Sequence, residues 1–326
     1  MGVVQTKLSK RKLVVLAGLF LLLFLVEVLL AGLAWVRLPT VGHNGQFNLL
    51  ILGIGGTGHE ASDLTDTMMV LLANQKTKKF LLVSLPRDIW IDPLKTKINT
   101  LYHYGGFELV GRETTGILDQ PIDETLLVDF KIFGEVIDSL GGIKIDVDHS
   151  FDDFYYPVPG KENDDCSGDP KLSCRYEYLH FDAGWQTMNG ERALKFVRSR
   201  YAEGEEGTDF ARTIRQQKVI FALKDKIFSS KTLGNPKRLW NLWQIVGKNT
   251  KTDLDQKDFL PLARFFSSFW PGTSLESIVL DGGALGGEGL LYHPKSHSSG
   301  QWVLLPVGGD WEKIQEYLNQ KIKTKN

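Results

Sequence analysis

Short apolar runs and amphipathic segments alternate along most of this chain. Apolar runs with the length of buried strands occur at residues 47–54, 67–75, 79–88, 123–130, 143–148, 274–282 and 301–307. Apolar positions at helical spacing occur at 105–118, 131–142, 209–227, 235–247, 255–270 and from 310 onward. A polar turn at 76–79 joins two of the runs into a hairpin, so the sheet that they form is mixed. The pattern predicts an α/β fold: a single αβα sandwich domain from residue 46 to 326 with a mixed central sheet.

The N-terminus carries a basic cluster followed by one long apolar run. The cluster consists of Lys7, Lys10, Arg11 and Lys12. The run extends from Leu13 to Val36, interrupted only by Glu27, and a helix of that length crosses a hydrocarbon core of about 30 Å. We therefore expect a cytoplasmic tail at 1–12, a transmembrane helix at 13–36, a linker at 37–45 and an extracytoplasmic domain after it. A cleavable signal peptide is the alternative.

The periodic pattern stops between residues 149 and 183. This segment is polar and contains Gly and Pro, which predicts a long irregular insertion that is functional or mobile. It holds both cysteines of the chain, Cys166 and Cys174, and an oxidising exterior favours a disulfide between them. A metal site is the poorer interpretation, because its ligand set would need more Cys or a nearby His.

Charge and motif content exclude several classes of function. The formal net charge is −1 and the charges are interspersed, so we expect no nucleic-acid partner. The glycine-rich segment at 53–58 lacks the Lys-Ser/Thr of a phosphate-binding loop and leads into a strand, which disfavours nucleotide binding. The sequence also lacks the GxSxG and HExxH motifs of common hydrolases.

Arginines occupy positions where a core would have apolar residues. Arg198 and Arg200 follow the apolar run ALKFV and project from one face if that run is a strand. In the helix predicted after them, the apolar stripe extended upstream reaches Arg212 and Gln216. Burying unpaired guanidinium groups is unfavourable, so the group predicts an anionic ligand, and their forked geometry suits phosphate. Internal pairing is the alternative, with Glu203, Glu205, Glu206 and Asp209 as partners.

Two carboxylates stand at predicted strand ends. Asp66 precedes one strand, and Asp88 follows Arg87 at the end of another. Carboxylates beside arginines suit a complex of Mg²⁺ with pyrophosphate, since Mg²⁺ prefers one or two carboxylates plus phosphate oxygens. A simple ion pair between Asp66 and Arg87 is equally consistent with the spacing.

Eight short motifs occur in order behind the predicted membrane span. They are LTDTMM, SLPRD, KINTLYHYGG, VDF, SLGGIKIDV, MNGERAL, FVRSR and DFARTIRQQ. Each is weak alone, but together, over about residues 47–226, they closely resemble the LytR-CpsA-Psr family.

The resemblance implies a membrane-anchored enzyme that binds a polyprenyl-pyrophosphate-linked glycan. Such an enzyme transfers the glycan, with its proximal phosphate, to peptidoglycan; the lipid lies in an apolar tunnel between sheet and helices. Carried onto this chain, arginines and Mg²⁺ (or Mn²⁺) hold the pyrophosphate through Arg87, Arg198, Arg200, Arg212 and Gln216, with Asp66 as a metal ligand. Lys97 and Asn99 are further substrate-binding candidates, and Asp88 is a candidate base or acceptor-orienting group.

The chain departs from the family pattern near the expected metal. Many members have an Asp directly after the first strand and an Arg shortly before the DTM motif. Here Gly55 and Gly56 follow the strand and Leu64 replaces that Arg. The second metal ligand is then either a carboxylate of Asp63 or Glu60, or an extra water on the metal. Two other functions stay open: hydrolysis of polyprenyl pyrophosphate at the same site, and non-catalytic lipid-glycan binding that regulates envelope assembly.

Overall fold

A mixed sheet contains most of the strands that the apolar runs predicted. In the computed structural model, which describes residues 41–56, 63–227, 229–254, 256–269, 274–280 and 289–323, six strands pair in the order β11-β6-β1-β2-β3-β12. Their bounds are Gln46–Ile54 for β1, Thr67–Asn74 for β2, Lys79–Leu85 for β3, Glu124–Asp129 for β6, Lys251–Thr252 for β11 and Ser274–Val279 for β12. β2 is antiparallel to β1 and β3, whereas β6 and β12 run parallel to β1 and β3, respectively. The mixed α/β sheet is therefore confirmed.

The pairing register brings several strand ends to one edge of this sheet. Ile54 at the end of β1 pairs with Asp129 at the end of β6, and Leu85 at the end of β3 pairs with Met68 near the start of β2. β12 ends at the same level, because it is parallel to β3. We call this the carboxyl edge; Asp66, directly before β2, lies on it.

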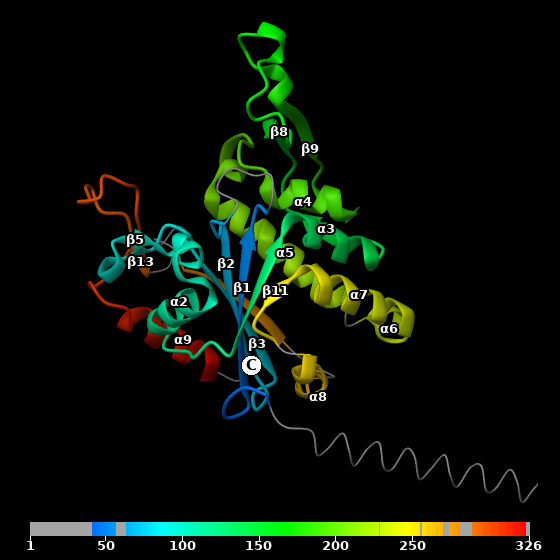
Figure 1. The fold of residues 1–326 in the computed structure, drawn as a ribbon, viewed down its shortest axis with the longest axis vertical. Coiled ribbons are helices and arrows are strands. Elements are labelled where there is room, and N and C mark those ends of the chain that lie inside the picture. The colour runs from blue at the N-terminus through cyan, green and yellow to red at the C-terminus, as the bar shows by residue number, and fades with distance from the viewer. Residues whose placement is uncertain are drawn as a thin grey trace, which may run out of the picture. The chain divides into compact units, whose positions relative to one another are not determined.

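Helices cover both faces of the sheet (Figure 1). α2 (Leu101–Leu118) and α9 (Glu312–Lys323) cover one face and share a core cluster with Leu50, Leu52 and Val70 of the strands. The helices on the other side are α3 (Phe130–Ser139), α4 (Gly190–Arg198), α5 (Asp209–Ile227), α6 (Ser230–Leu233) and α7 (Pro236–Asn249). This is the three-layer arrangement that the alternation of strands and helices predicted.

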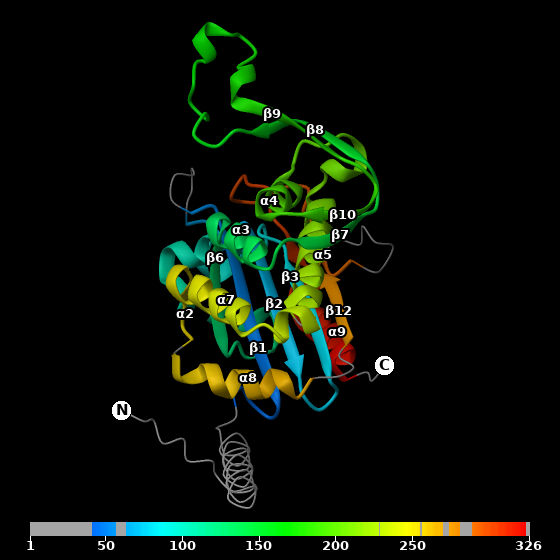
Figure 2. The same ribbon diagram turned by 90° about the vertical axis from the view of Figure 1, so that its right-hand side faces the viewer.

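The segment at 149–183 is more regular than predicted. β8 (Phe151–Pro157) and β9 (Tyr176–Phe181) form an antiparallel hairpin that projects beyond the carboxyl edge (Figure 2). Its base packs beside a second strand pair, β7 (Ile143–Val147) with β10 (Gly184–Met188). The expectation of an irregular insertion was wrong for the two strands, because a bulge between Asp153 and Tyr156 and a run of three aromatic residues hide the alternating pattern of β8. Between the strands, residues 158–175 form only two short 3-10 turns.

The ALKFV run is helical, so the condition under which Arg198 and Arg200 would project from one face of a strand is not met. α4 begins after Asn189, whose side chain accepts a hydrogen bond from the backbone N–H of Arg192 at 2.8 Å. Ala193, Phe196 and Val197 are buried at helical spacing, a pattern that a five-residue window cannot distinguish from a strand. The two arginines of the FVRSR motif therefore do not project from one face of a strand.

Several short elements connect the longer strands and helices. They are β4 (Trp90–Ile91), β5 (Thr96–Lys97), β13 (Leu291–Tyr292) and β14 (Leu305–Pro306), with short 3-10 turns at 92–94, 98–100, 166–168, 173–175 and 204–207. Of the strand predicted at 301–307, only β14 forms, and it pairs with β13.

The predicted tail at 1–12 and the predicted membrane helix at 13–36 lie outside the described residues. Within the ranges that the structure does describe, no helix combines the length and apolar character needed to span a membrane. Contacts divide the chain into two units, 42–254 with 272–326, and 1–41 with 255–271. The second unit contains the turn at 256–258 and α8 (Phe259–Ser267). The boundaries of tail, span, linker and domain stay predictions.

Candidate functional site

A cavity of about 450 Å³ lies at the carboxyl edge of the sheet, within the size range of small-molecule sites. Its buried apolar lining consists of Met68, Met69, Leu85 and Leu280. Its charged and amide lining consists of Asp66, Arg87, Asp88, Arg212 and Gln216. A third part is aromatic and comes from the C-terminal segment, with Tyr292, His293 and Trp302. The structure thus brings together five residues that the sequence predicted, from separate elements, around one cavity.

Opposite charges alternate along one side of this cavity. Arg87 Nη1 lies 2.6 Å from Asp66 Oδ1, and Arg87 Nε lies 3.6 Å from Asp88 Oδ2. Lys97 Nζ donates to Asp88 Oδ1 at 2.7 Å. Asp66 and Arg87 therefore do pair, as the simpler interpretation expected. The Asp66 side chain is still 53% exposed, so the pair remains open to a ligand from the cavity.

The KIN segment ties the two charged turns together through its backbone. The Asn99 carbonyl accepts hydrogen bonds from the backbone N–H of Thr65 at 3.0 Å and from its hydroxyl at 3.1 Å. The Asn99 N–H donates to the Arg87 carbonyl at 3.4 Å. Asn99 Oδ1 is buried and has no hydrogen-bond partner among the described residues. Lys97 and Asn99 thus lie behind the cavity lining and position Asp66, Arg87 and Asp88.

Helix α5 presents polar side chains to the cavity and also uses one to dock on the sheet. Arg212 and Gln216, which continue the apolar stripe of this helix, line the cavity. The neighbouring Gln217 is buried and donates from Nε2 to Ser84 Oγ at 2.9 Å and to the Ile278 carbonyl at 3.3 Å. This amide fixes the helix to β3 and β12, and sequence reasoning missed it because it lies one position off the stripe.

Arg215 is the buried arginine of this region, with 3% of its side chain exposed. Its guanidinium donates to the carbonyls of Phe196, Ser199 and Glu206 at 3.0, 2.7 and 2.8 Å, and to the Glu206 carboxylate at 2.7 Å. Burial lowers the pKa of Arg215 from its ordinary value, and the bond to Glu206 opposes that shift. The internal pairing that the acidic segment suggested therefore includes Arg215, a residue that the sequence did not single out.

The loop at 198–201, here called the arginine loop, carries the two arginines of the FVRSR motif. Asp153 of β8 is fully buried and accepts hydrogen bonds from Ser199 Oγ at 2.6 Å and from the backbone N–H groups of Arg200 and Tyr201 at 3.2 and 3.3 Å. The Arg215 guanidinium donates a hydrogen bond to the Ser199 carbonyl. The loop is thus held through both its donors and its acceptors. Sequence alone did not identify Asp153, because the run FDDF contains two adjacent aspartates and its pattern does not show which of them is buried.

Besides Lys97 and Asn99, three predicted site residues lie outside the cavity lining. The Arg198 guanidinium stands 4.0 Å from the ring centroid of Phe130, which directly follows β6. This places Arg198 at the carboxyl edge, across β1 from Asp66 and across β1 and β2 from Arg87 and Asp88. Arg200 is exposed. Asp63 lies beside His103, with 3.7 Å between Oδ2 and Nδ1, and Glu60 falls outside the described residues.

Asp129 is a carboxylate at the same edge that sequence reasoning did not place in the site. It ends β6, and its Oδ1 caps α3 by accepting from the backbone N–H of Ile132 at 2.8 Å. Gly56 has a φ of +79°, and a Cβ there would lie 3.1 Å from Asp129 Cβ. The glycine after β1 therefore lets the backbone pass close to this carboxylate.

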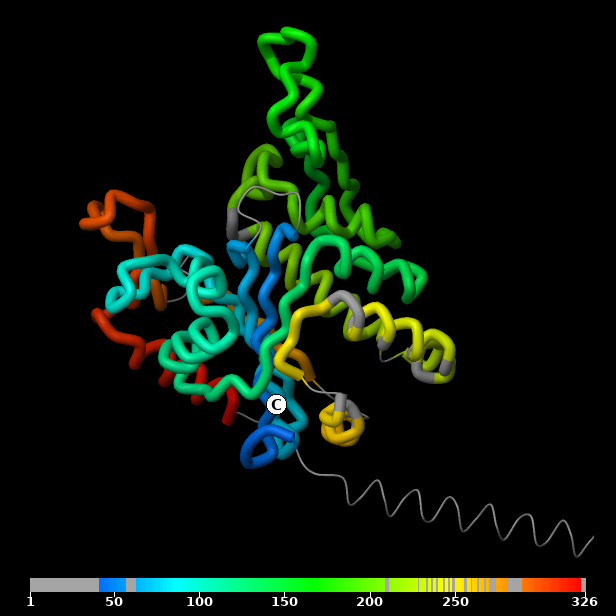
Figure 3. Tube along the Cα trace, viewed as in Figure 1, coloured from blue at the N-terminus to red at the C-terminus, as the bar shows by residue number. Residues whose placement is uncertain are grey.

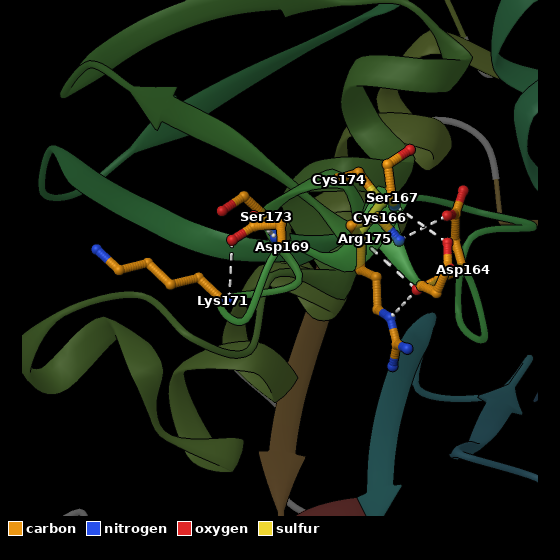
Figure 4. The surroundings of a disulfide bond; sticks show 9 residues. Asp164, Cys166, Ser167, Asp169, Lys171, Ser173, Cys174 and Arg175 are labelled. Atoms are coloured by element: carbon orange, nitrogen blue, oxygen red, sulfur yellow. Dashed lines mark hydrogen bonds between the residues drawn. A yellow bond between two sulfur atoms is a disulfide. The ribbon is translucent and has the colours of Figure 1, made fainter.

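Cys166 and Cys174 form the predicted disulfide at the tip of the hairpin (Figure 4). Arg175 Nε donates to the Asp164 carbonyl at 2.7 Å, and the Asp169 carboxylate accepts from the backbone N–H groups of Lys171 and Ser173. Asp164 and the two sulfur atoms gather as a metal site would, but the sulfur atoms are bonded to each other. The preference for a disulfide over a metal site is confirmed for this part of the described chain.

Comparison with known proteins gives a consistent result. A sequence model of the LytR_cpsA_psr family matches residues 36–289. The polyisoprenyl-teichoic acid–peptidoglycan teichoic acid transferase TagT of Bacillus subtilis (strain 168) is 29% identical over 246 residues, covering 73% of this chain and 68% of TagT. TagV of the same organism, which carries the same descriptive name, is 28% identical over 230 residues, covering 68% of this chain. That alignment covers 54% of TagV, so the chain spans about half the length of this relative.

Solved structures show the same fold. The crystal structure of B. subtilis TagV superposes with a TM-score of 0.61 at 24% identity, covering 87% of this chain and 100% of that chain. The structure described as TagT bound to LIIa-WTA superposes with a TM-score of 0.57 at 25% identity, covering 86% of this chain and 92% of that chain.

Proposed function

The chain belongs to the LytR_cpsA_psr family, and on that premise we propose that it is an extracytoplasmic phosphotransferase anchored by its N-terminal helix. It moves a glycopolymer, with its proximal phosphate, from a polyprenyl-pyrophosphate carrier to peptidoglycan. The observation that carries the proposal is the cavity where Arg87 and Arg212 stand with Asp66 and Asp88 at the carboxyl edge. The names of TagT and TagV support this reaction class rather than a particular glycopolymer.

An incompletely covered apolar face of the sheet supports a lipid as part of the substrate. Five apolar side chains on the face toward α5 and α7 are only partly buried, although Met69 and Leu82 on this face are fully buried. The five are Leu49, Ile51, Leu71, Leu126 and Val128. On the opposite face of the same strands, Leu50, Leu52 and Val70 are fully buried. A polyprenyl chain between the sheet and these helices would remove the exposed apolar surface from water, at about 25 cal/mol per Å² buried.

The charged residues can supply the chemistry of phosphoryl transfer. The acceptor hydroxyl attacks the phosphorus that bears the sugar, a new oxygen–phosphorus bond forms, and the bond to the bridging oxygen breaks. Polyprenyl phosphate leaves with that electron pair. Charge spreads over the phosphoryl oxygens and the leaving group, where Arg87 and Arg212 stabilise it. Asp88, oriented by Lys97 at 2.7 Å, orients the acceptor hydroxyl or takes its proton.

Asp66 fits a Mg²⁺ or Mn²⁺ site, because its exposed carboxylate lines the cavity where phosphate oxygens would complete the ligand set. Asp63, the second expected ligand, stands apart from the lining, beside His103. When bound, the ion would neutralise charge on the pyrophosphate. In a titration of farnesyl diphosphate, Mg²⁺ should strengthen binding to the wild-type chain and have no effect on Asp66→Asn. An equal Mg²⁺ effect on both proteins would remove Asp66 from the metal site.

Mass spectrometry of organic extracts from the purified full chain tests the substrate class. We expect a polyprenyl mono- or diphosphate in the wild type and in the control Arg112→Ala, whose arginine lies on the surface of α2 beside Glu113. The Arg87→Ala/Arg212→Ala variant should yield none. The transferase proposal fails if the wild type is empty and stays empty when offered polyprenyl diphosphate with Mg²⁺.

A non-catalytic lipid-glycan binder is the second candidate, favoured by one observation. Arg87 and Asp66 pair with each other at 2.6 Å, as they would in a site that performs no chemistry. Incubation with a lipid-linked glycan and peptidoglycan separates the outcomes. Glycan joined to peptidoglycan supports transfer, and glycan phosphate released into solution supports hydrolysis. Binding with neither product supports the binder.

A further inference from the structure

The phosphoryl-transfer chemistry proposed above does not use the aromatic part of the cavity lining. Trp302 and Tyr292 are 52% and 45% exposed, although both line the cavity with the arginines. The rings of Trp302 and His293 are stacked, with centroids 4.9 Å apart and an angle of 20° between their planes. The imidazole covers one face of the indole, and about half of the Trp302 surface is still exposed. Large exposed aromatic surfaces beside a polar cleft mark recognition sites.

Backbone hydrogen bonds hold this aromatic rim against the charged turn. The Leu304 N–H donates to the Asp88 carbonyl at 2.9 Å, and the Trp90 N–H donates to the Leu304 carbonyl at 3.0 Å. The two segments therefore run side by side, although they lie far apart in sequence (Figure 3). His293 Nδ1 lies 2.9 Å from the carbonyl of the residue after Trp302, which orients the imidazole. The stacked rings of His293 and Trp302 are thus fixed relative to Asp88, as a preorganised binding site requires.

We propose that Trp302, with His293 and Tyr292, forms the subsite for the sugar directly attached to the pyrophosphate. The inference rests on the proposed function. A pyranose ring presents an apolar C–H face, which packs on an indole, and a rim of hydroxyl groups. Tyrosine, histidine and carboxylate groups beside the indole can hydrogen-bond that rim.

The difference in burial between the apolar and the aromatic lining residues favours the donor sugar as the ligand of this subsite. Met69, which lies on the sheet face proposed for the lipid, is buried, whereas Trp302 and Tyr292 are exposed, so the apolar part suits the lipid side and the aromatic part suits the solvent side. A polymer must leave the cavity toward solvent, and its first sugar is bonded to the phosphate that the arginines hold. A sugar of the acceptor has no such tether, so the subsite is assigned to the donor.

Calorimetric titration of the full chain in detergent with two soluble analogues tests the subsite. One is farnesyl diphosphate, and the other is farnesyl diphosphate carrying a single N-acetylhexosamine. Trp302→Ala should weaken binding of the sugar-bearing analogue about tenfold and leave the affinity for farnesyl diphosphate within about twofold. Trp302→Phe, which keeps an aromatic face, should retain most of the affinity. Trp185→Ala is the control, because Trp185 is also exposed but lies on β10, outside the cavity.

The outcomes separate the subsite from the proposed function. Equal weakening of both analogues by Trp302→Ala, or weakening of neither, would overturn the subsite while the arginines keep their role. Equal affinity of the wild type for both analogues would overturn the subsite as well. A wild type that binds neither analogue would instead remove the proposed function itself.

Discussion

Arg212 and Arg215 lie about one helical turn apart on α5, yet the structure predicts opposite consequences of removing them. Arg212 lines the cavity, whereas Arg215 is 3% exposed and bonds to three carbonyls and the Glu206 carboxylate. Arg215→Met keeps the apolar stem but leaves Glu206 without this partner. Breaking a buried ion pair in this way costs about 3–5 kcal/mol. Arg212→Ala removes a partly exposed side chain, so we expect it to change stability by less than about 1 kcal/mol.

Thermal unfolding followed by circular dichroism measures this difference. In a domain of this size, 1 kcal/mol shifts the melting temperature by about 2–4 °C, so Arg215→Met should melt roughly 10 °C below the wild type. Arg212→Ala should melt within about 3 °C of it. Farnesyl diphosphate affinity should show the reverse, with a loss of at least about tenfold in Arg212→Ala and little change in Arg215→Met at a temperature where that variant is folded.

Two results would refute this division of roles. One is a similar melting temperature for the two variants, because it would mean that the four hydrogen bonds of Arg215 contribute little. The other is a loss of farnesyl diphosphate affinity in folded Arg215→Met, which would make Arg215 a direct ligand. Arg212→Lys is a useful control, since it keeps the charge and loses the forked geometry.

Three further predictions concern the hairpin and its contact with the arginine loop. Asp153→Asn should lower stability by about 2–3 kcal/mol in urea unfolding and should lower transfer activity, because a neutral amide replaces a buried carboxylate that accepts four hydrogen bonds. Hydrogen bonds to Asp152 and, secondarily, to Asp182 raise the pKa of His180 above 6.5. The contact of protonated His180 with these carboxylates therefore stabilises the hairpin below pH 6.5, and this stabilisation is lost as the pH rises through the raised pKa. An NMR titration should show a lower pKa of His180 in Asp152→Asn. Reducing the Cys166–Cys174 disulfide should expose the hairpin tip to proteolysis while the melting temperature of the rest stays within about 3 °C, because the bond closes a short, exposed loop; a large fall in that temperature would contradict a local role.

The sequence predicted the sheet and the cavity's charged residues because both depend on local patterns. Buried strands appear as apolar runs, and their register places residues that flank them at a common edge. Asp66, Arg87 and Asp88 were therefore predictable as strand-end groups, and Arg212 with Gln216 as an interrupted helical stripe. These arguments need only the period of each element and the pairing of neighbouring strands.

The residues that the sequence missed act through contacts between distant segments. Arg215 lies on the same helix as Arg212, and only the approach of the loop after α4 makes it a structural residue. Asp153 meets its partners 46 to 48 positions later in the chain. Trp302 enters the cavity because Leu304 bonds to Asp88, a contact that no periodicity predicts. Tertiary hydrogen bonds of this kind have no local signature.

The pairing of Arg87 with Asp66 makes anion and cation binding at the carboxyl edge interdependent. Arg87 Nη1 already lies 2.6 Å from Asp66 Oδ1. In the proposed site, a phosphate bound to Arg87 would leave Asp66 available to a cation, and a cation on Asp66 would release Arg87 for phosphate. Each ligand would then strengthen the binding of the other by the same factor, as linkage requires. A mutually neutralised pair therefore favours a pyrophosphate together with a divalent ion over either one alone, which is why Asp66→Asn separates a metal-dependent site from a simple anion site.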